Sequence, residues 1–299
     1  MGGVIRAPAA YSSLRAVDRS AWGNRSMVNM VGGRTTTMKA SERVSAFRRE
    51  RAEVVSLCKD LDDAEWRTQS RAAGWRVHDV VAHMGSGCRA VFGPAVVTFM
   101  RSADVERTNE VFVIRRREWS SARVLAEYER WSRYLATGSA LLARTPVKRM
   151  RLPLAELGRF PAGLLLPGAM LFDHHIHLRF DIAPALGRTV PPTDPVRMAG
   201  VVEWMFAVLS NQLRSAENDW LAYPLDIVLN GSGGGIWRVH PGGAVTAGCA
   251  RGAAAATVEG QVDEFPEWAT SRAAWRDRSV RISGDENYAA RFLDSVNVV

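Results

Sequence analysis

Cysteine is scarce in this chain of 299 residues. Its three cysteines, Cys58, Cys88 and Cys249, include no Cys-x-x-Cys pair. A disulfide framework and a cysteine-rich zinc site are therefore excluded as the basis of the fold. This cysteine usage fits a reducing compartment, and we expect the protein to be cytoplasmic.

Long apolar runs are also missing. The longest, residues 91–100 and 160–172, are well short of the about 18 to 20 residues that a membrane-spanning helix needs, and Pro and Gly interrupt them. The first 20 residues contain Arg6, Arg15 and Arg19 but no continuous apolar segment of the kind found in signal peptides. We therefore predict no targeting segment and no contact with a membrane.

Acidic residues do not balance the basic ones, and the formal net charge is +8. Residues 1–40 hold six basic side chains and one acidic one, whereas the remaining residues hold 33 basic and 30 acidic ones. Basic clusters such as 115–117 and 148–151 lack the interleaved aromatic residues or the recognition-helix pattern of nucleic-acid binders. We interpret them as solvated faces and predict no nucleic-acid partner.

The length of the chain favours two domains, and a composition of 47% hydrophobic and 23% charged residues is ordinary for a soluble protein. Residues 1–40 are rich in Gly, Ser, Arg and Thr without an apolar period, which predicts a disordered extension. Met38 is a candidate alternative start. Regular structure is expected from Ser41 onwards.

Apolar residues recur at helical spacing in four segments of the first half. We predict helices from Ser41 to about residue 60, from about 76 to 93, over 120–142 and over 169–186. Gly187 would close the fourth helix unless Pro184 ends it one turn earlier. With a further helix over 196–213, these segments predict a helical bundle over residues 41–215.

The pattern changes beyond this point. Residues 225–229, 235–239 and 280–282 are expected to be strands separated by glycine-rich turns, and 264–271 and 286–296 are expected to be helical. Residues 216–299 are therefore predicted to form a small α+β domain, so the whole chain belongs to the α+β class, with a four-helix bundle followed by a mixed domain.

The residues with the clearest chemistry are His83 on the second predicted helix and a histidine-rich run on the fourth. Positions four apart share a helix face, so Asp173 and His177 can converge on one ion with His83 facing them. Imidazole and carboxylate suit zinc and also iron, nickel or cobalt, and three protein ligands leave a coordination position open. The alternative is that these are ordinary core or surface residues, but a carboxylate on an otherwise apolar helix needs a partner.

The neighbouring residues are given less specific expectations. His174 and His175 point to other faces and are expected to be exposed or to lie behind the ligands. Asp181 either orients a ligand histidine or is solvated, and the sequence leaves both open. Cys88 is interpreted as a packing residue, and so are two tryptophans, Trp75 and Trp131.

Several of these motifs together resemble the mycothiol-dependent maleylpyruvate isomerase family, whose members are DinB-like metal-binding bundles with a sterol-carrier-like second domain. The resemblance rests on the segments GWRVHDVVAH (74–83), Asp173-x-x-x-His177, DIAPALG (181–187), GIW (235–237), and the stretches around residues 267–272 and 281–285. It extends from about Ser41 to the C-terminus.

The resemblance implies a metal held by a histidine on helix two and a Glu-x-x-x-His pair on helix four, which correspond here to His83, Asp173 and His177. Asp173 departs from the family, because aspartate is one methylene shorter than the commoner glutamate. Phe180 is an extra residue before Asp181. Arg272 matches an arginine that faces the active site of the isomerase, and it is predicted to be catalytic by pairing with a substrate carboxylate. The alternative is that it is a surface arginine, like its neighbours Arg276 and Arg278.

The function that follows is a metal-dependent, mycothiol-using isomerase or thiol transferase acting on a small-molecule electrophile. The metal, most readily zinc, would lower the pKa of the bound thiol, and the thiolate would attack the electrophile. In an isomerase the thiolate would be expelled after bond rotation, and in a transferase it would stay attached. The alternatives are a metal-dependent hydrolase on the same scaffold and a non-catalytic protein that binds a small apolar ligand.

Overall fold

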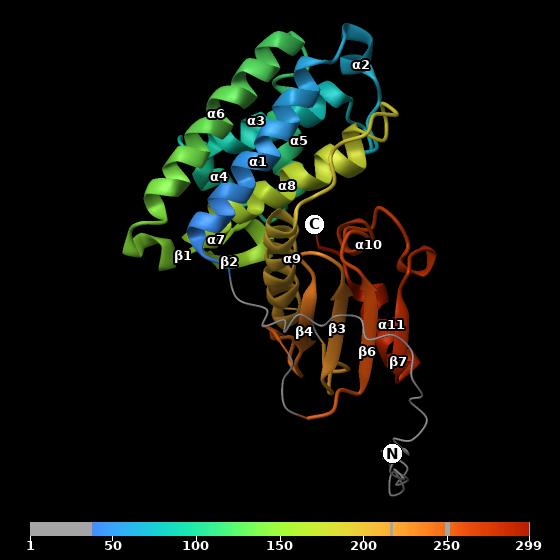
Figure 1. The fold of residues 1–299 in the computed structure, drawn as a ribbon. Coiled ribbons are helices and arrows are strands. Elements are labelled where there is room, and N and C mark those ends of the chain that lie inside the picture. The colour runs from blue at the N-terminus through green and yellow to red at the C-terminus, as the bar shows by residue number, and fades with distance from the viewer. Residues whose placement is uncertain (1–37, 216–217, 249–251, 299) are drawn as a thin grey trace, which may run out of the picture. The chain divides into compact units, whose positions relative to one another are not determined.

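The helical half of the protein is organised around four helices. The structure, a computed structural model, describes residues 38–215, 218–248 and 252–298. Within these, four helices contact one another in the order α1–α6–α3–α8, and α8 also contacts α1 (Figure 1). They are α1 (Ala40–Lys59), α3 (Val77–Ala90), α6 (Ser121–Leu142) and α8 (Met170–Ile176). The predicted extension over residues 1–40 falls almost entirely outside the described residues.

Each of the first three helices begins at a side chain that satisfies a free backbone N–H group. The carboxylate of Glu42 accepts a hydrogen bond from the N–H of Lys39 at 2.7 Å, and that of Asp79 accepts one from the N–H of Arg76 at 3.0 Å. The hydroxyl of Ser120 accepts one from the N–H of Arg123 at 3.3 Å. These capping interactions explain why the predicted starts agree closely with the observed ones.

Shorter elements fill the intervals between the four helices. They are α2 (Asp63–Arg67), α4 (Ala95–Arg101), α5 (Val105–Ile114), η2 (Pro146–Arg149), η3 (Ala155–Leu157), α7 (Ala162–Leu164) and the antiparallel pair β1 (Arg151–Leu154) and β2 (Gly158–Pro161). The sequence patterns predicted none of them. Helix α4 illustrates the difficulty, since its short sequence AVVTFMR is apolar at most positions and shows no periodic contrast between an apolar and a polar face.

The fourth predicted helix is continuous but not uniform. Its α-helical part, α8, lies between two π-helical segments, η4 (Leu165–Ala169) and η5 (His177–Ile182). A π-helix has more residues per turn than an α-helix, and η5 contains Phe180, the residue that the resemblance marks as extra. The helix ends at Ile182, just before Pro184, so the alternative of an end one turn before Gly187 is confirmed. Gly187, with a φ of 62°, lies in the turns that follow.

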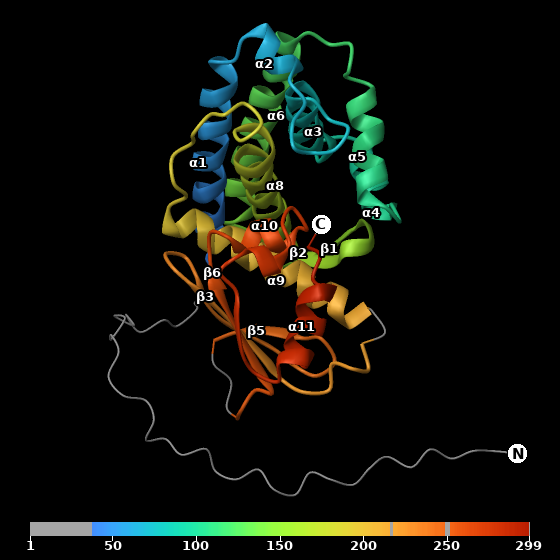
Figure 2. The ribbon, with the colours of Figure 1, turned by 90° about the vertical axis from the view of Figure 1, so that its right-hand side faces the viewer.

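A long helix, α9 (Pro195–Ser215), leads into the sheet of the second half (Figure 2). The strand order is β5-β4-β3-β6-β7, in which β3 and β6 are parallel and the other pairs are antiparallel. The strands are β3 (Leu225–Asn230), β4 (Gly235–Val239), β5 (Val245–Ala247), β6 (Ala256–Gln261) and β7 (Arg281–Gly284), with α10 (Phe265–Ala269), η6 (Trp275–Asp277) and α11 (Glu286–Ser295). The predicted α+β class is confirmed.

One hydrophobic cluster connects the two halves. It contains side chains from α1, α6, α8 and α9 together with side chains from the central strands and α11, among them Phe47, Leu135, Leu171, Trp204, Ile227, Val258 and Phe292. A second cluster lies within the helical half and includes Val54, Val80, Tyr128 and Leu178. The predicted boundary near residue 215 therefore follows a change of secondary structure, and the larger apolar core extends across it.

Two further sequence expectations concern surfaces. Within the described ranges, no single helix has both the length and the hydropathy of a membrane span, although α3 and α4, with a bend of 99° between them, reach those limits jointly by length and composition. In the basic cluster at 115–117, Arg116 is buried and its guanidinium binds the carboxylate of Glu127. Its interpretation as part of a solvated face is therefore wrong.

Candidate functional site

The three predicted ligand residues lie together between α3 and α8. His83 comes from α3, Asp173 from α8, and His177 begins the π-helical segment η5. The Nε2 atom of His83 is 2.9 Å from Oδ1 of Asp173, and Nε2 of His177 is 3.6 Å from the same oxygen. One potential ligand atom from each residue lies within 4.8 Å of the other two. The structure thus brings together all three residues that the sequence singled out.

These donors suit a small divalent cation. In a tetrahedral zinc site with bonds of about 2.0–2.1 Å, ligand atoms are separated by about 3.4 Å. The two distances to Asp173, 2.9 and 3.6 Å, lie on either side of that value. The other ring nitrogen of His177, Nδ1, is 2.7 Å from Oδ2 of Asp181. A proton on Nδ1 leaves Nε2 free to act as an electron-pair donor, as in carboxylate–histidine–metal sites. The residues therefore fit such an ion.

Asp181 links the site to the second half of the chain. Its side chain is 1% exposed, and it accepts hydrogen bonds from Nε and Nη2 of Arg272 at 3.0 and 2.8 Å. Of the two readings that the sequence left open, solvation is therefore wrong, and Asp181 orients the ring of His177. The two residues are four positions apart, the spacing that places side chains on one face of a helix.

Arg272 does not stand free at the site. Its planar fork is bound to Asp181 through two nitrogens, and its side chain is 22% exposed. The role predicted for it, pairing with a substrate carboxylate, stays a prediction. The observed contact gives it a further task, because it fixes the carboxylate that in turn fixes His177.

Electrostatics keep the carboxylates ionised. Burial by itself would raise the pKa of Asp173, but His83, His174 and His177 hold that pKa well below its usual value. Burial would likewise lower the pKa of His83, and the opposing charge of Asp173 raises it instead. Burial would raise the pKa of Asp181, and its contacts with His177 and Arg272 lower it. The site therefore presents anionic oxygen atoms, which a cation would neutralise.

The two other histidines of the run are buried, so the expectation that they could be exposed is wrong. His174 is 0% exposed and lies between the rings of Phe47 and Tyr128, with centroids 5.2 and 5.3 Å away. Its Nδ1 is 3.3 Å from Oδ2 of Asp173. His175 is 1% exposed and receives a hydrogen bond from Nε of Arg179 at 3.2 Å. Both pack behind the ligand residues.

A cavity of about 390 Å³ opens beside the three ligand residues. Its lining is mainly aliphatic and aromatic and comes from α3, α4, α5, the β1–β2 region, η4, α8 and α9. The apolar lining residues include Val91, Val96, Phe99, Met100, Leu152, Leu154, Leu157, Leu165, Leu166, Met170, Phe172, Ile176 and Trp204. A pocket of this size can enclose a small organic molecule next to the ion site.

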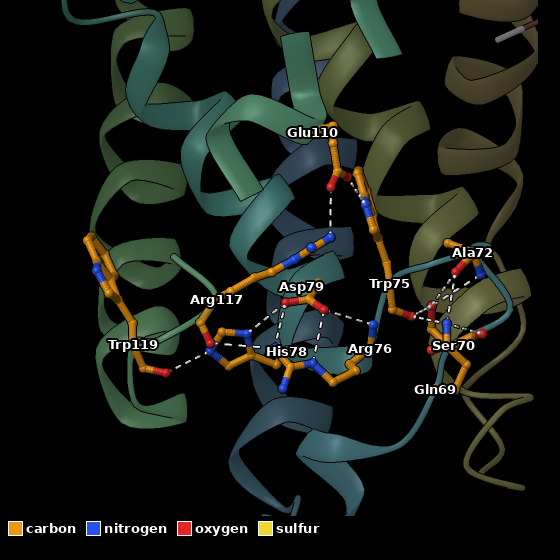
Figure 3. A network of polar contacts seen from close by, with 10 residues as sticks. All are labelled: Gln69, Ser70, Ala72, Trp75, Arg76, His78, Asp79, Glu110, Arg117 and Trp119. Carbon is orange, nitrogen blue, oxygen red and sulfur yellow. Dashed lines mark hydrogen bonds and ion pairs between the residues drawn. The ribbon is translucent and has the colours of Figure 1, made fainter. Parts of the chain in front are cut away.

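Trp75 forms a wall of this cavity. Its ring centroid is 5.0 Å from that of His83, and its Nε1 donates a hydrogen bond to Glu110 at 2.6 Å. Arg117 also binds Glu110, at 2.7 Å, while Gln69 and Ser70 hold the backbone carbonyl of Trp75 (Figure 3). Trp75 also belongs to the hydrophobic cluster of the helical half, so its interpretation as a packing residue is confirmed. Its additional place in the cavity wall was not predicted, since no spacing in the sequence relates it to Glu110.

The other two packing interpretations agree with their surroundings. Cys88 is fully buried, and its sulfur is 3.9 Å from that of Met170. Trp131 packs on Phe92 with ring centroids 5.7 Å apart. Asn109 and Glu106 from α5 also line the cavity, and the sequence gave no signal for either.

Residues 47–183 match the family model of the mycothiol maleylpyruvate isomerase N-terminal domain. No curated protein matches the chain. Among solved structures, the crystal structure of the mycothiol-dependent maleylpyruvate isomerase and that of a histidine-to-alanine mutant of it both match with a TM-score of 0.52.

In each of these comparisons the identity is 16%, and the match covers 82% of this chain and 93% of the other. At this identity the structural match establishes a shared fold, and the family model identifies the sequence family of the helical half. Residues 47–183 are therefore similar to the mycothiol maleylpyruvate isomerase N-terminal domain, and the chain shares the fold of the solved mycothiol-dependent maleylpyruvate isomerase.

Proposed function

We propose that the protein is a metal-dependent, mycothiol-using isomerase or thiol transferase that acts on a small electrophile. The observation that carries this proposal is the convergence of His83, Asp173 and His177 at the wall of a largely apolar cavity. Three protein donors are typical of catalytic metal sites, which keep a coordination position for a further ligand. The solved isomerase of the same fold is named as mycothiol-dependent, so we take mycothiol as the thiol. The cavity has room for a small reactant beside the ion site.

Each group at the site would have a distinct chemical role. His83, Asp173 and His177 would hold the ion, and zinc is the first choice for two imidazoles and one carboxylate. With both groups bound, the metal would lower the pKa of the mycothiol thiol and so provide a nucleophile near neutral pH. The apolar wall would exclude water from the reacting atoms.

Asp181 and Arg272 would act as positioning residues. Asp181 holds the tautomer and the orientation of the His177 ring, and Arg272 holds Asp181. Arg272 is in addition proposed to face one carboxylate or carbonyl oxygen of the substrate, because it also lines the cavity. A substitution of Arg272 should therefore change both the metal affinity and the substrate KM.

The first experiment is to measure the metal content of the purified protein beside two variants, His83→Ala and His177→Ala. His240→Ala is the matched control, because His240 bonds Thr246 in the second half and not the site residues. Near-stoichiometric metal in the wild type and the control, with a loss of at least about tenfold in affinity for both site variants, is expected. Metal content that neither variant changes would show that the site assignment is wrong.

The second experiment titrates mycothiol into the metal-loaded and the metal-free protein and follows heat release. Binding that requires the metal supports the thiol-activating role. Ester or amide turnover that proceeds without mycothiol would instead identify a metal-dependent hydrolase. Binding of an apolar ligand that neither metal nor mycothiol affects, without turnover, would identify a non-catalytic binding protein.

A further inference from the structure

Most of the cavity lining is apolar, and its few charged side chains are mainly acidic. Aliphatic and aromatic side chains from α4, the β1–β2 region, η4 and α8 form most of it. Among the described residues that line it, the charged side chains are Glu106, Asp173 and Arg272, together with the two ligand histidines. Two of the three permanent charges are thus negative.

The one positive charge in this set is already engaged. Arg272 donates through Nε and Nη2 to both oxygens of Asp181, a carboxylate that is itself 1% exposed. A bidentate arginine–carboxylate pair largely neutralises the charge of the guanidinium. A divalent metal ion would compensate Asp173 and the activated thiolate, but nothing in the described lining would compensate two further carboxylates on a substrate.

Burying an uncompensated carboxylate against aliphatic side chains is costly. Maleylpyruvate, which names the solved relative, is a molecule with two carboxylates. Phe99 and Met100 of α4 line the same cavity as the ligand residues and provide contacts for hydrocarbon. The charges and the apolar side chains of the lining therefore favour a substrate with fewer carboxylates than maleylpyruvate.

We propose that the substrate of this protein is an electrophile with an apolar body and at most one carboxylate. This inference rests on the proposed thiol-dependent function. The polar, reactive end lies toward His83, Asp173 and Arg272, and the hydrocarbon part lies along α4, where Val96, Phe99 and Met100 contact it. A dicarboxylate of the same skeleton binds more weakly.

The test uses three compounds that share the maleate double bond and differ in charge. Dibutyl maleate has no carboxylate, monobutyl maleate has one and maleate has two. Calorimetry with metal-free protein measures binding without chemistry. Proton NMR with zinc and mycothiol measures cis-to-trans isomerisation above the uncatalysed thiol background. The reaction consumes nothing, because the two isomers have the same atoms and the thiol is returned. The diester or the monoester is expected to bind about tenfold or more tightly than the dianion.

Two neighbouring valines of α4 supply matched variants. Val96 lines the cavity, whereas Val97 is 45% exposed and does not line it. Val96→Lys adds a positive charge to the lining and is expected to reduce the preference for the neutral compound by about tenfold. Val97→Lys adds the same charge outside and is expected to leave the preference unchanged, so the pair separates a local charge effect from a change in overall charge.

The outcomes separate this inference from the proposed function. Faster isomerisation and tighter binding of the dianion would leave the thiol chemistry intact and overturn the substrate class. Tighter binding of the esters, with no mycothiol-dependent turnover of any compound, would support the preference of the cavity and contradict the proposed function. Equal effects of the two lysine variants would also overturn the inference, because the cavity lining would then not set the preference.

Discussion

Replacement of Asp181 by asparagine tests the contact that joins the two halves of the site. In the structure, Oδ2 of Asp181 accepts from Nδ1 of His177 at 2.7 Å and from Nη2 of Arg272 at 2.8 Å, and Oδ1 accepts from Nε of Arg272 at 3.0 Å. Asparagine has one oxygen and one NH2 group, so it cannot accept at both positions. Its NH2 group must face a donor of Arg272 or take the place opposite His177.

Either orientation disturbs the ligand. An NH2 group that faces His177 would move the ring proton to Nε2, the atom proposed to bind the metal. An NH2 group that faces Arg272 would place two donors together in a buried position and displace the guanidinium. Loss of a carboxylate behind a ligand histidine typically costs 10- to 100-fold in metal affinity, which corresponds to about 1.4 to 2.7 kcal/mol.

The assay is competition for zinc with a chromophoric chelator at fixed pH, combined with urea unfolding. Asp226→Asn is the control, because Asp226 forms a comparable two-point pair with Arg238, at 2.6 and 2.7 Å, in the sheet. We expect the control to lose stability without a change in zinc affinity. Zinc affinity of Asp181→Asn within about twofold of the wild type would refute the role of Asp181.

Two predictions concern stability. The Glu50 carboxylate is fully buried beside His175, Arg179 and Arg197; burial would raise its pKa, but these partners lower it from 4.5 to about 2. Its stabilisation is thus fully present above pH 4.5 and lost as pH falls through about 2. Glu50→Gln should lower the free energy of unfolding at pH 7 by about 3 kcal/mol in a urea titration and remove this acid dependence; an unchanged value would contradict the ionised pair. Gly243→Ala should lower the free energy of unfolding by about 2 kcal/mol more than Gly242→Ala does. Both glycines have positive φ, but only at Gly243 would an added Cβ lie 2.5 Å from the carbonyl carbon of Leu213. Equal melting temperatures of the two variants would argue against that close approach.

Much of the helical half could be predicted because its information is local. Apolar residues at helical spacing and capping side chains such as Ser120 and Asp79 define α1, α3 and α6 within a few residues. The three proposed ligands could be found for the same reason, since Asp173 and His177 are four positions apart on one helix. His83 required the further assumption that two helices face each other.

The rest depends on contacts between distant residues. Strand β6 was missed because the residues it turns inward are mostly small, Ala256, Val258 and Gly260, which gives a weak alternation. In the β1–β2 pair, Pro153 and Pro161 interrupt strands of four residues each. The partners of Trp75 and Asp181 lie 35 and 91 positions away, and no local pattern carries such pairings.

The apolar cluster shared by Phe47, Leu171, Trp204 and Phe292 has a consequence for how the molecule responds to its ligands. A group that binds only the native state adds its binding free energy to the stability of whatever unfolds with its site. Because α9 packs against the bundle and the sheet within one core, an ion or reactant held at His83 would protect the distant strands as well as the helices. Occupancy of the site would therefore be coupled to the lifetime of both halves in the presence of proteases.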